Sequence, residues 1–262
     1  MFCAGILVLL VLVAIFAPVI APYDPTYQDY SAVLAEPSMA HPFGTDEYGR
    51  DILSRIIYGS RVSLSIGIVA QIVASIVGVT LGAVAGYYGG RIDSVISRIM
   101  EIFQAFPDLI FAMAIMTFLG KGVLNLFIAL GLLTWVRTAR MIRGSVMQLK
   151  EKEYIEASRA CGASTFWIIT KGLVPNCLST IIVLVTLGIP NAIMYEASLS
   201  FLGIGIQPPT PSWGNMISAA QTFISYRPVY SIMPGVAIMI TVIAFNIFGD
   251  GLRDALDPKL KN

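Results

Sequence analysis

The sequence EASRACG, residues 156–162, lies within a basic segment that interrupts an otherwise apolar chain. Small or apolar side chains recur around it at i, i+3, i+4 and i+7, which predicts a short helix with one small-residue face and one charged face. Gly162 then predicts the end of this helix. A rigid, charged helix of this kind is typical of a surface on which another protein docks. The residues of the small face are Tyr154, Ala157, Ser158 and Cys161.

The basic segment extends over residues 137–175 and contains seven cations. So many charges cannot lie in hydrocarbon, so we expect a water-exposed connection, at about residues 137–177, between two membrane spans. The cations are Arg137, Arg140, Arg143, Lys150, Lys152, Arg159 and Lys171.

Composition indicates a membrane protein. Of 262 residues, 56% are hydrophobic and only 13% are charged, and the mean hydropathy is +0.77. In soluble domains about a quarter of the residues are charged, so the low charged fraction here indicates that lipid surrounds the chain. The net charge of +1 gives no sign of a nucleic-acid partner. The three cysteines have no metal or pairing pattern, and His41 is the single histidine.

Apolar runs predict an all-α membrane protein with about six transmembrane helices. The first run, residues 2–20, could instead be a signal peptide, but it lacks a basic start and a clear cleavage site, so we expect a retained span. The fourth span is short, so its helix is expected to continue into the basic segment. The fifth is expected to kink or end near Pro190. The remaining spans are predicted at about residues 62–88, 99–119, 123–136, 178–195 and 232–248.

Two polar stretches flank these spans. Residues 21–61 carry an excess of acidic residues, and from Thr45 the pattern predicts an amphipathic helix on the membrane surface. We therefore divide the chain into residues 1–61, a first helix with an extracytoplasmic segment, and residues 62–262, a five-helix core that contains the basic connection. The Gly/Pro-rich residues 200–228 are expected to re-enter or cap the membrane surface.

The second span carries small residues at a spacing of four, on one helix face. In lipid such a row permits close backbone contact between helices. The contact could be within this chain or with a partner subunit in the membrane. The candidate packing residues are Ala74, Gly78, Gly82 and Gly86.

Polar residues inside the apolar spans are candidates for a translocation pathway. Asp108 follows Pro107 in the third span, where a charge is costly unless it is paired or hydrated. It is expected either to line a polar pathway or to pair with a neighbouring helix. Gln104 and Glu196 are the other candidates.

The distribution of cations predicts the orientation. With six spans, twelve of the 17 Lys and Arg residues fall on the side of the basic segment and the C-terminus, and five on the other. The positive-inside rule places the basic segment and the C-terminus in the cytoplasm.

Motifs of catalysis and nucleotide binding are missing from the sequence. The nearest approach to a P-loop, Gly120-Lys121-Gly122, lacks the required spacing, and neither an H-E-x-x-H nor a G-x-S-x-G pattern occurs. We therefore expect no enzymatic activity. A self-sufficient channel or carrier remains an alternative at this point.

The stretch EASRACG with LVPN, residues 173–176, resembles the EAA motif of ABC-importer permeases, E-A-A-x3-G followed by I-x-L-P. Glu156, Ala157, Gly162 and Pro175 match, and Ser158 replaces an alanine. The downstream half departs from the pattern, since its isoleucine and leucine positions are occupied here by Gly172 and Val174.

Three longer stretches extend the resemblance over nearly the whole chain. They are similar to the C-type permease of dipeptide, oligopeptide and nickel importers. The stretches are HPFGTDEYGRDILSRIIYGSRVSL (41–64), EASLSFLGIGIQPPTPSWGNMI (196–217) and GDGLRDALDP (249–258).

This resemblance implies a type I ABC importer permease fold in the plasma membrane of a bacterium or archaeon. It implies a B-type permease partner, two cytosolic ATPase subunits and an extracytoplasmic solute-binding protein. ATP and Mg would be used by the ATPases, with no cofactor on this chain. The substrate would be a di- or oligopeptide, with nickel as the alternative. The EAA segment would be a coupling helix, rather than a solvated loop that only sets topology, with contacts from Glu156, Ala157, Ser158, Arg159, Ala160 and Gly162.

Overall fold

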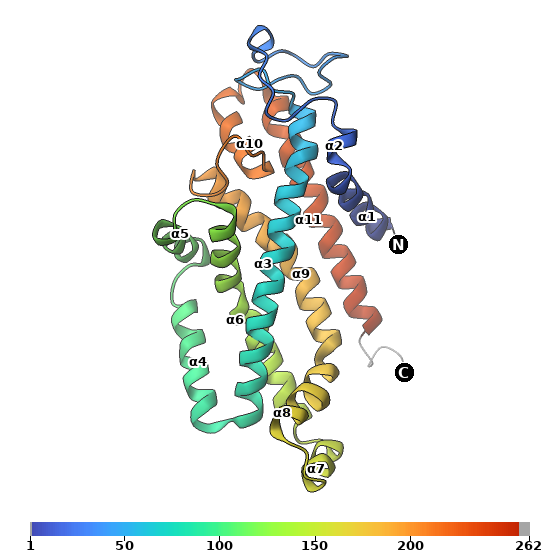
Figure 1. Ribbon diagram of the computed structural model, residues 1–262, viewed down its shortest axis with the longest axis vertical. Helices are drawn as coiled ribbons and strands as arrows, with labels where there is room; N and C mark the ends of the chain where they lie inside the picture. Colours follow the sequence, from blue (N-terminus) through green and yellow to red (C-terminus); the bar gives the residue numbers. More distant parts are fainter. Residues whose placement is uncertain (1, 257–262) are drawn as a thin grey trace.

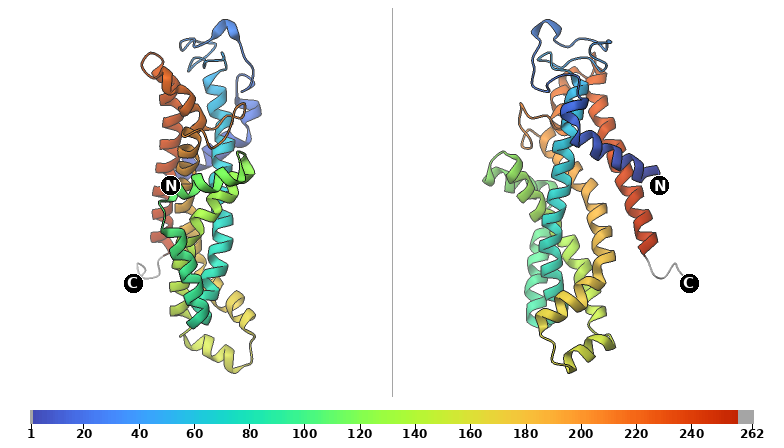
Figure 2. Two further views of the ribbon diagram at one scale, coloured as in Figure 1. Left: turned by 90° about the vertical axis from the view of Figure 1, so that its left-hand side faces the viewer. Right: turned by 45° about the vertical axis from the view of Figure 1, so that its right-hand side comes forward.

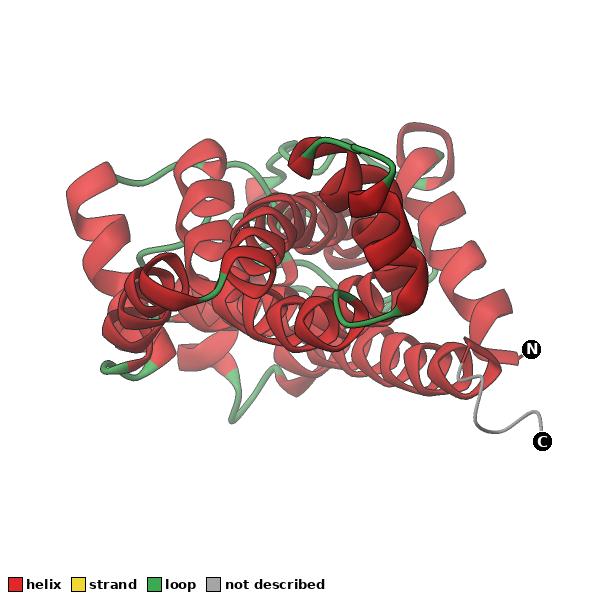
Figure 3. Cartoon of the chain, turned by 90° about the horizontal axis from the view of Figure 1, so that it is seen from below, coloured by secondary structure: helices red, strands yellow, loops and turns green. Residues whose placement is uncertain are grey.

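The computed structural model describes residues 2–256, and these residues form an elongated bundle of helices without a β-strand (Figures 1 and 3). Pro258, the last residue of the stretch 249–258, lies outside the described residues. So do Lys259 and Lys261, two of the twelve cations on the side of the basic segment. The helical elements are α1 Phe2–Ile15, α2 Ala17–Ile20, η1 Tyr30–Ala32, α3 Ile52–Tyr88, α4 Gly90–Gln104, α5 Asp108–Leu119, α6 Val123–Leu149, α7 Glu153–Ala160, α8 Thr165–Trp167, η2 Ile168–Leu173, η3 Val174–Cys177, α9 Leu178–Phe201, α10 Trp213–Ala220, η4 Gln221–Phe223 and α11 Pro228–Leu256.

Four helical segments are long and apolar enough to cross a membrane. They are Ile52–Tyr88, Val123–Leu149, Thr165–Phe201 and Pro228–Leu256. The predicted all-helical membrane fold is therefore confirmed. The fifth expected span is longer than predicted, because the helix continues through Pro190 to Phe201. A proline is tolerated inside a transmembrane helix where neighbouring groups satisfy the freed carbonyl.

The first and third expected spans are interrupted. The helix that begins at Phe2 stops at Ile15, and Pro18 stands in the first turn of α2. Proline cannot donate a backbone hydrogen bond and clashes with the preceding turn, which accounts for the break. The third span consists of α4 and α5, which are bent by 91°. Pro107 precedes α5 and has the same effect there.

The surface helix expected from Thr45 is instead the beginning of α3. Asp51 caps α3 by accepting a hydrogen bond from the Ser54 backbone N–H at 2.7 Å, and the helix then runs uninterrupted for 37 residues. At 1.5 Å per residue this is about 55 Å, longer than the ~30 Å hydrocarbon core, so the first turns reach beyond it. The expected division at residue 61 thus falls inside a continuous helix.

The row of small residues on α3 packs against α6 of the same chain. A Cβ atom added at Gly78 would lie 2.7 Å from the Trp135 carbonyl oxygen, and one at Gly86 would lie 2.7 Å from that of Arg143. Gly82 faces Ala139 in the same way, and Ala74 is fully buried beside α6. Of the two expected contacts, the structure therefore has the one within the chain.

The first part of the basic segment is helical. Arg137, Arg140 and Arg143 all lie on α6, which continues to Leu149. Arg143 forms a two-pronged ion pair with Asp93 of α4, with NH2 to Oδ2 at 2.6 Å. Arg140 donates a hydrogen bond to Gln104. The short fourth span predicted that its helix continues into the basic segment, and these three arginines lie on that continuation. Pairing of this kind lowers the cost of a cation beside an apolar span.

Residues 21–51 form a head at the end of the bundle that α10 also occupies (Figure 1). Within the head, Arg50 Nε donates to the buried Asp46 carboxylate at 2.6 Å. The Tyr230 hydroxyl of α11 donates to Glu47 at 2.5 Å. The Tyr230–Glu47 bond joins the head to the bundle, and α7 lies at the opposite end of the molecule (Figures 1 and 2).

Candidate functional site

The helix α7 stands beyond the bundle at the end opposite the head and runs across its long axis (Figure 2). It is anchored by Ile155, which is fully buried against Ile168 and Leu173. A Cβ atom at Gly172 would lie 2.9 Å from the Ile155 Cδ1 atom, so a glycine there leaves room for the anchor. This packing explains why a small residue occupies a position where the resembled motif has isoleucine.

The end of α7 is a Schellman motif, in which two backbone N–H groups return to carbonyls of the last turn. Ala163 N–H donates to the Ser158 carbonyl and Gly162 N–H to that of Arg159, each at 3.0 Å. Gly162 has φ +81°, a conformation that side chains disfavour. Ser164 Oγ then accepts from the Trp167 N–H at 3.3 Å and starts the next helix. The predicted helix and its end at Gly162 are confirmed.

The outward face of α7 borders an open groove. It lies between α7 and α8, and the side chain of Trp167 on its far wall is 48% exposed. Small side chains form the near wall, which leaves the backbone of α7 accessible to close approach. The lining residues are Ala157, Ser158, Cys161, Gly162, Ala163, Ser164 and Trp167.

The charged residues of α7 differ in their contacts. Glu156 is exposed and forms no ion pair with any described residue, and Ala160 is exposed beside it. The Arg159 guanidinium lies over the Tyr87 ring, 5.3 Å from its centroid, and so connects α7 to the end of α3. Glu156 is therefore available to a partner, whereas Arg159 already has a contact within the chain.

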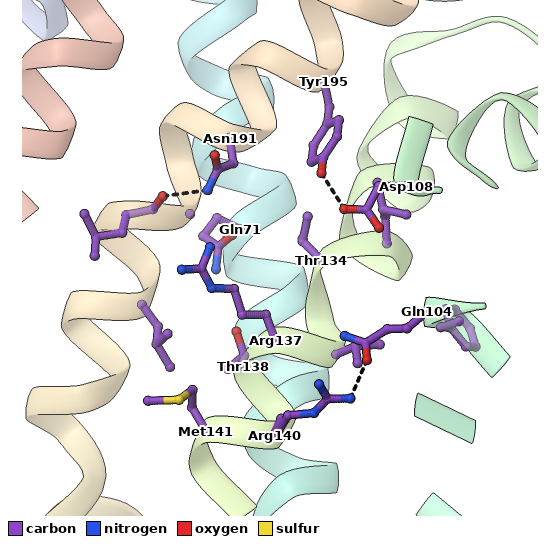
Figure 4. Close-up of a pocket in the computed structure, with 16 residues that line it drawn as sticks. Gln71, Gln104, Asp108, Thr134, Arg137, Thr138, Arg140, Met141, Asn191 and Tyr195 are labelled. Atoms are coloured by element: carbon purple, nitrogen blue, oxygen red, sulfur yellow. Dashed lines mark hydrogen bonds between the residues drawn. The ribbon is translucent and has the colours of Figure 1, made fainter. Parts of the chain in front are cut away.

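A second feature is a cavity of about 380 Å³ between α3, α6, α9 and the bent α4–α5 pair (Figure 4). Its walls combine apolar side chains with a carboxylate, two guanidinium groups, amides and hydroxyls. The lining residues are Gln71, Phe103, Gln104, Asp108, Leu133, Thr134, Val136, Arg137, Thr138, Arg140, Met141, Leu184, Leu187, Gly188, Asn191 and Tyr195.

Asp108 and Gln104 both face this cavity. Asp108 is the first residue of α5 and accepts a hydrogen bond of 2.5 Å from the Tyr195 hydroxyl of α9. Gln104 is the last residue of α4 and accepts from Arg140 of α6. Asp108 therefore pairs with a neighbouring helix and also lines the cavity, and its role in a pathway stays a prediction.

Glu196 lies elsewhere. Its side chain is fully buried, and its carboxylate accepts hydrogen bonds from Ser200 Oγ at 2.7 Å and Ser63 Oγ at 3.4 Å. It does not line the cavity that Gln104 and Asp108 share. In this structure, hydroxyl partners satisfy the carboxylate inside the protein, and a role for Glu196 in a pathway stays a prediction.

Sequence reasoning missed three cavity residues. Arg137 was predicted only as a cation of the water-exposed basic segment, and Gln71 and Asn191 were not singled out within their apolar spans. Gly188 of α9 makes the space for Gln71, since a Cβ there would overlap its side-chain amide. A polar amide within an apolar span is the signal that could have identified both amide residues.

Comparison with known proteins identifies the family of this chain. Residues 78–262 match the family of the binding-protein-dependent transport system inner membrane component. The chain belongs to this family. Residues 1–37 of the permease further match the N-terminal transmembrane domain of oligopeptide transport permease C.

Individual relatives are similar over almost the entire permease. It is 46% identical to the dipeptide transport system permease protein DppC of Alkalihalophilus pseudofirmus, over 96% of this chain and 83% of the relative. It is 43% identical to the glutathione transport system permease protein GsiD of Pectobacterium atrosepticum, over 99% and 87%. Among solved structures, an inward-facing MetNI methionine ABC transporter chain matches with a TM-score of 0.60 at 22% identity, over 79% of this chain and 98% of that one. The last likeness confirms the predicted type I permease fold.

Proposed function

We propose that the permease is the C-type subunit of an ATP-driven importer for di- or oligopeptides. The relatives named above belong to dipeptide and glutathione transport systems, and glutathione is a tripeptide, which supports a peptide substrate over nickel. In this proposal a related B-type permease forms the other half of the pathway. Two cytosolic ATPase subunits and an extracytoplasmic solute-binding protein complete the importer.

The observation that carries the proposal is the construction of α7. It projects from the bundle, yet Ile155 and the Schellman turn at Gly162 fix it in place. Its outward face is small, exposed and bordered by a groove. We expect a helix with these properties to transmit a displacement, because Ile155 of α7 packs against Ile168 and Leu173 of η2, which leads through η3 into α9. We therefore assign ATPase coupling to Glu156, Ala157, Ser158, Arg159, Ala160 and Gly162.

The orientation follows from charge. The end of the bundle that carries α7 also carries the α3–α4 turn, which lies on the side expected to hold twelve of the 17 cations (Figure 1). The positive-inside rule assigns this end, and the C-terminus with it, to the cytoplasm. The head formed by residues 21–51 then faces the solute-binding protein. ATP and Mg bind to the ATPases, and this chain is a non-catalytic subunit without a cofactor.

The test uses Glu156→Lys and Gly162→Val, with Lys171→Gln as the matched control, since Lys171 is an exposed cation away from the groove. The first two variants should reach the membrane but copurify poorly with the ATPases and lose most ATP-dependent peptide uptake. The control should behave as wild type. Normal uptake with ATPases attached to both variants would refute the coupling assignment. Uptake by the permease alone, or nickel uptake in place of peptide, would refute the importer or the substrate assignment respectively.

A further inference from the structure

Arg137 is the cavity cation whose guanidinium forms neither a hydrogen bond nor an ion pair with any described residue. Arg140 donates to Gln104, and Arg143, one turn further along α6, pairs with Asp93. No ion pair or hydrogen bond of the described chain involves the Arg137 guanidinium, although it lines the cavity. Arg137 is exposed in this subunit, so its guanidinium is accessible to an anion that enters the cavity.

The surroundings of Arg137 suit an anionic ligand group. In Figure 4 its side chain extends from α6 towards α9, beside the amide side chains of Gln71 and Asn191. Leu184 and Leu187 form the apolar wall next to it. A guanidinium presents a planar pair of N–H donors that matches the two oxygens of a carboxylate.

Asp108 supplies the opposite charge at the α5 side of the same cavity (Figure 4). Its Oδ2 atom accepts from the Tyr195 hydroxyl, which orients the carboxylate and leaves Oδ1 free of protein donors among the described residues. The cavity thus holds the carboxylate of Asp108 on α5 and, on α6, the guanidinium groups of Arg137 and Arg140, of which only that of Arg140 is hydrogen-bonded to a described residue. Its volume of about 380 Å³ is within the ~300–1,000 Å³ range of small-ligand sites.

We propose that Arg137 binds the C-terminal carboxylate of a peptide in transit while Asp108 faces its ammonium group. This inference rests on the proposed import of peptides. Peptides that differ in every side chain still share these two termini, so a pathway that contacts only the termini is indifferent to sequence. The competing explanation is that Arg137 pairs with a carboxylate of the partner permease.

The experiment compares ATP-dependent uptake of labelled dialanine and of its C-terminal amide, dialaninamide. The complete importer is reconstituted in proteoliposomes with Arg137→Gln, Arg137→Lys or the charge-loss control Lys171→Gln. All variants use the same binding protein, so its own selectivity cancels from the comparison. Copurification with the other subunits measures assembly.

The acid-to-amide uptake ratio should fall about ten-fold in Arg137→Gln, because a charge-assisted hydrogen bond to the carboxylate is lost while amide uptake is unaffected. Arg137→Lys should retain part of the ratio, and Lys171→Gln should match wild type. An unchanged ratio, an equal loss of uptake for both peptides, or loss of assembly would each overturn the inference. If the wild-type importer takes up both peptides and Arg137→Gln has the same acid-to-amide ratio, only this inference is refuted. If the wild-type importer takes up neither peptide, the peptide-importer proposal is refuted.

Discussion

Replacing Gly78 by alanine tests whether α3 and α6 are held together by direct backbone contact. The added Cβ atom would lie 2.7 Å from both the Trp135 carbonyl oxygen and the Thr138 Cβ atom. Neither atom is the end of a flexible side chain, so the two helices must move apart. Overpacking of this kind costs about 1–3 kcal/mol, and the higher helix propensity of alanine offsets about 0.5–1 kcal/mol of it. We expect a net loss of about 1–2 kcal/mol.

Gly144→Ala is the matched control for this substitution. Gly144 lies on α6, and a Cβ atom there meets nothing within 4 Å. The same chemical change should therefore stabilise the isolated permease by about 0.5–1 kcal/mol. The free energy of unfolding, measured by SDS titration of the purified chain in mixed micelles, should move in opposite directions for the two variants. If Gly78→Ala were as stable as Gly144→Ala, the close α3–α6 contact would be refuted.

Three further substitutions test other contacts. Ile155→Ala should loosen α7 by about 2–5 kcal/mol and reduce copurification of the ATPases, whereas Ile155→Val should cost only about 0.5–1.5 kcal/mol; equal ATPase recovery would contradict the anchoring role. Asp93→Asn should destabilise the bundle by roughly 1.5–3 kcal/mol in the same SDS titration, and adding Arg143→Gln should cost little more, because the two side chains act as a pair; additive losses would argue against it. Tyr230→Phe should speed proteolysis within residues 21–51 by removing the bond to Glu47, and an unchanged cleavage rate would show that this bond does not hold the head.

Local signals in the sequence predicted α7 well. Its periodicity and Gly162 define a helix and a Schellman end that depend on residues within one short stretch. The row of glycines on α3 was equally visible, but its partner was not, because identifying α6 requires knowing which helices are neighbours. The sequence left that choice open, and the structure shows the contact with Trp135 and Ala139.

Charged residues were harder to place, because their cost in a membrane depends on partners far apart in the sequence. The sequence predicted that Arg143 belongs to the water-exposed basic segment, but it did not reveal the ion pair with Asp93, fifty residues earlier. Glu196 was a candidate for the pathway. The sequence did not reveal that hydroxyls from α3 and the end of α9 enclose its carboxylate. The 91° bend beside Pro107 was also not predicted, because hydropathy contains no information on the direction in which a helix runs.

Labelling of Cys161 tests the docking of ATPases on α7 most directly. Cys161 is exposed at the groove, whereas Cys177 is buried, and the sequence has three cysteines, so Cys3→Ser with Cys177→Ala leaves a single reporter thiol. In inside-out membrane vesicles a membrane-impermeant maleimide should label Cys161 rapidly when the ATPases are stripped and slowly when they are restored. Labelling from the outer face instead, or a rate that is the same with and without ATPases, would contradict the assignment of α7 as the cytoplasmic coupling helix.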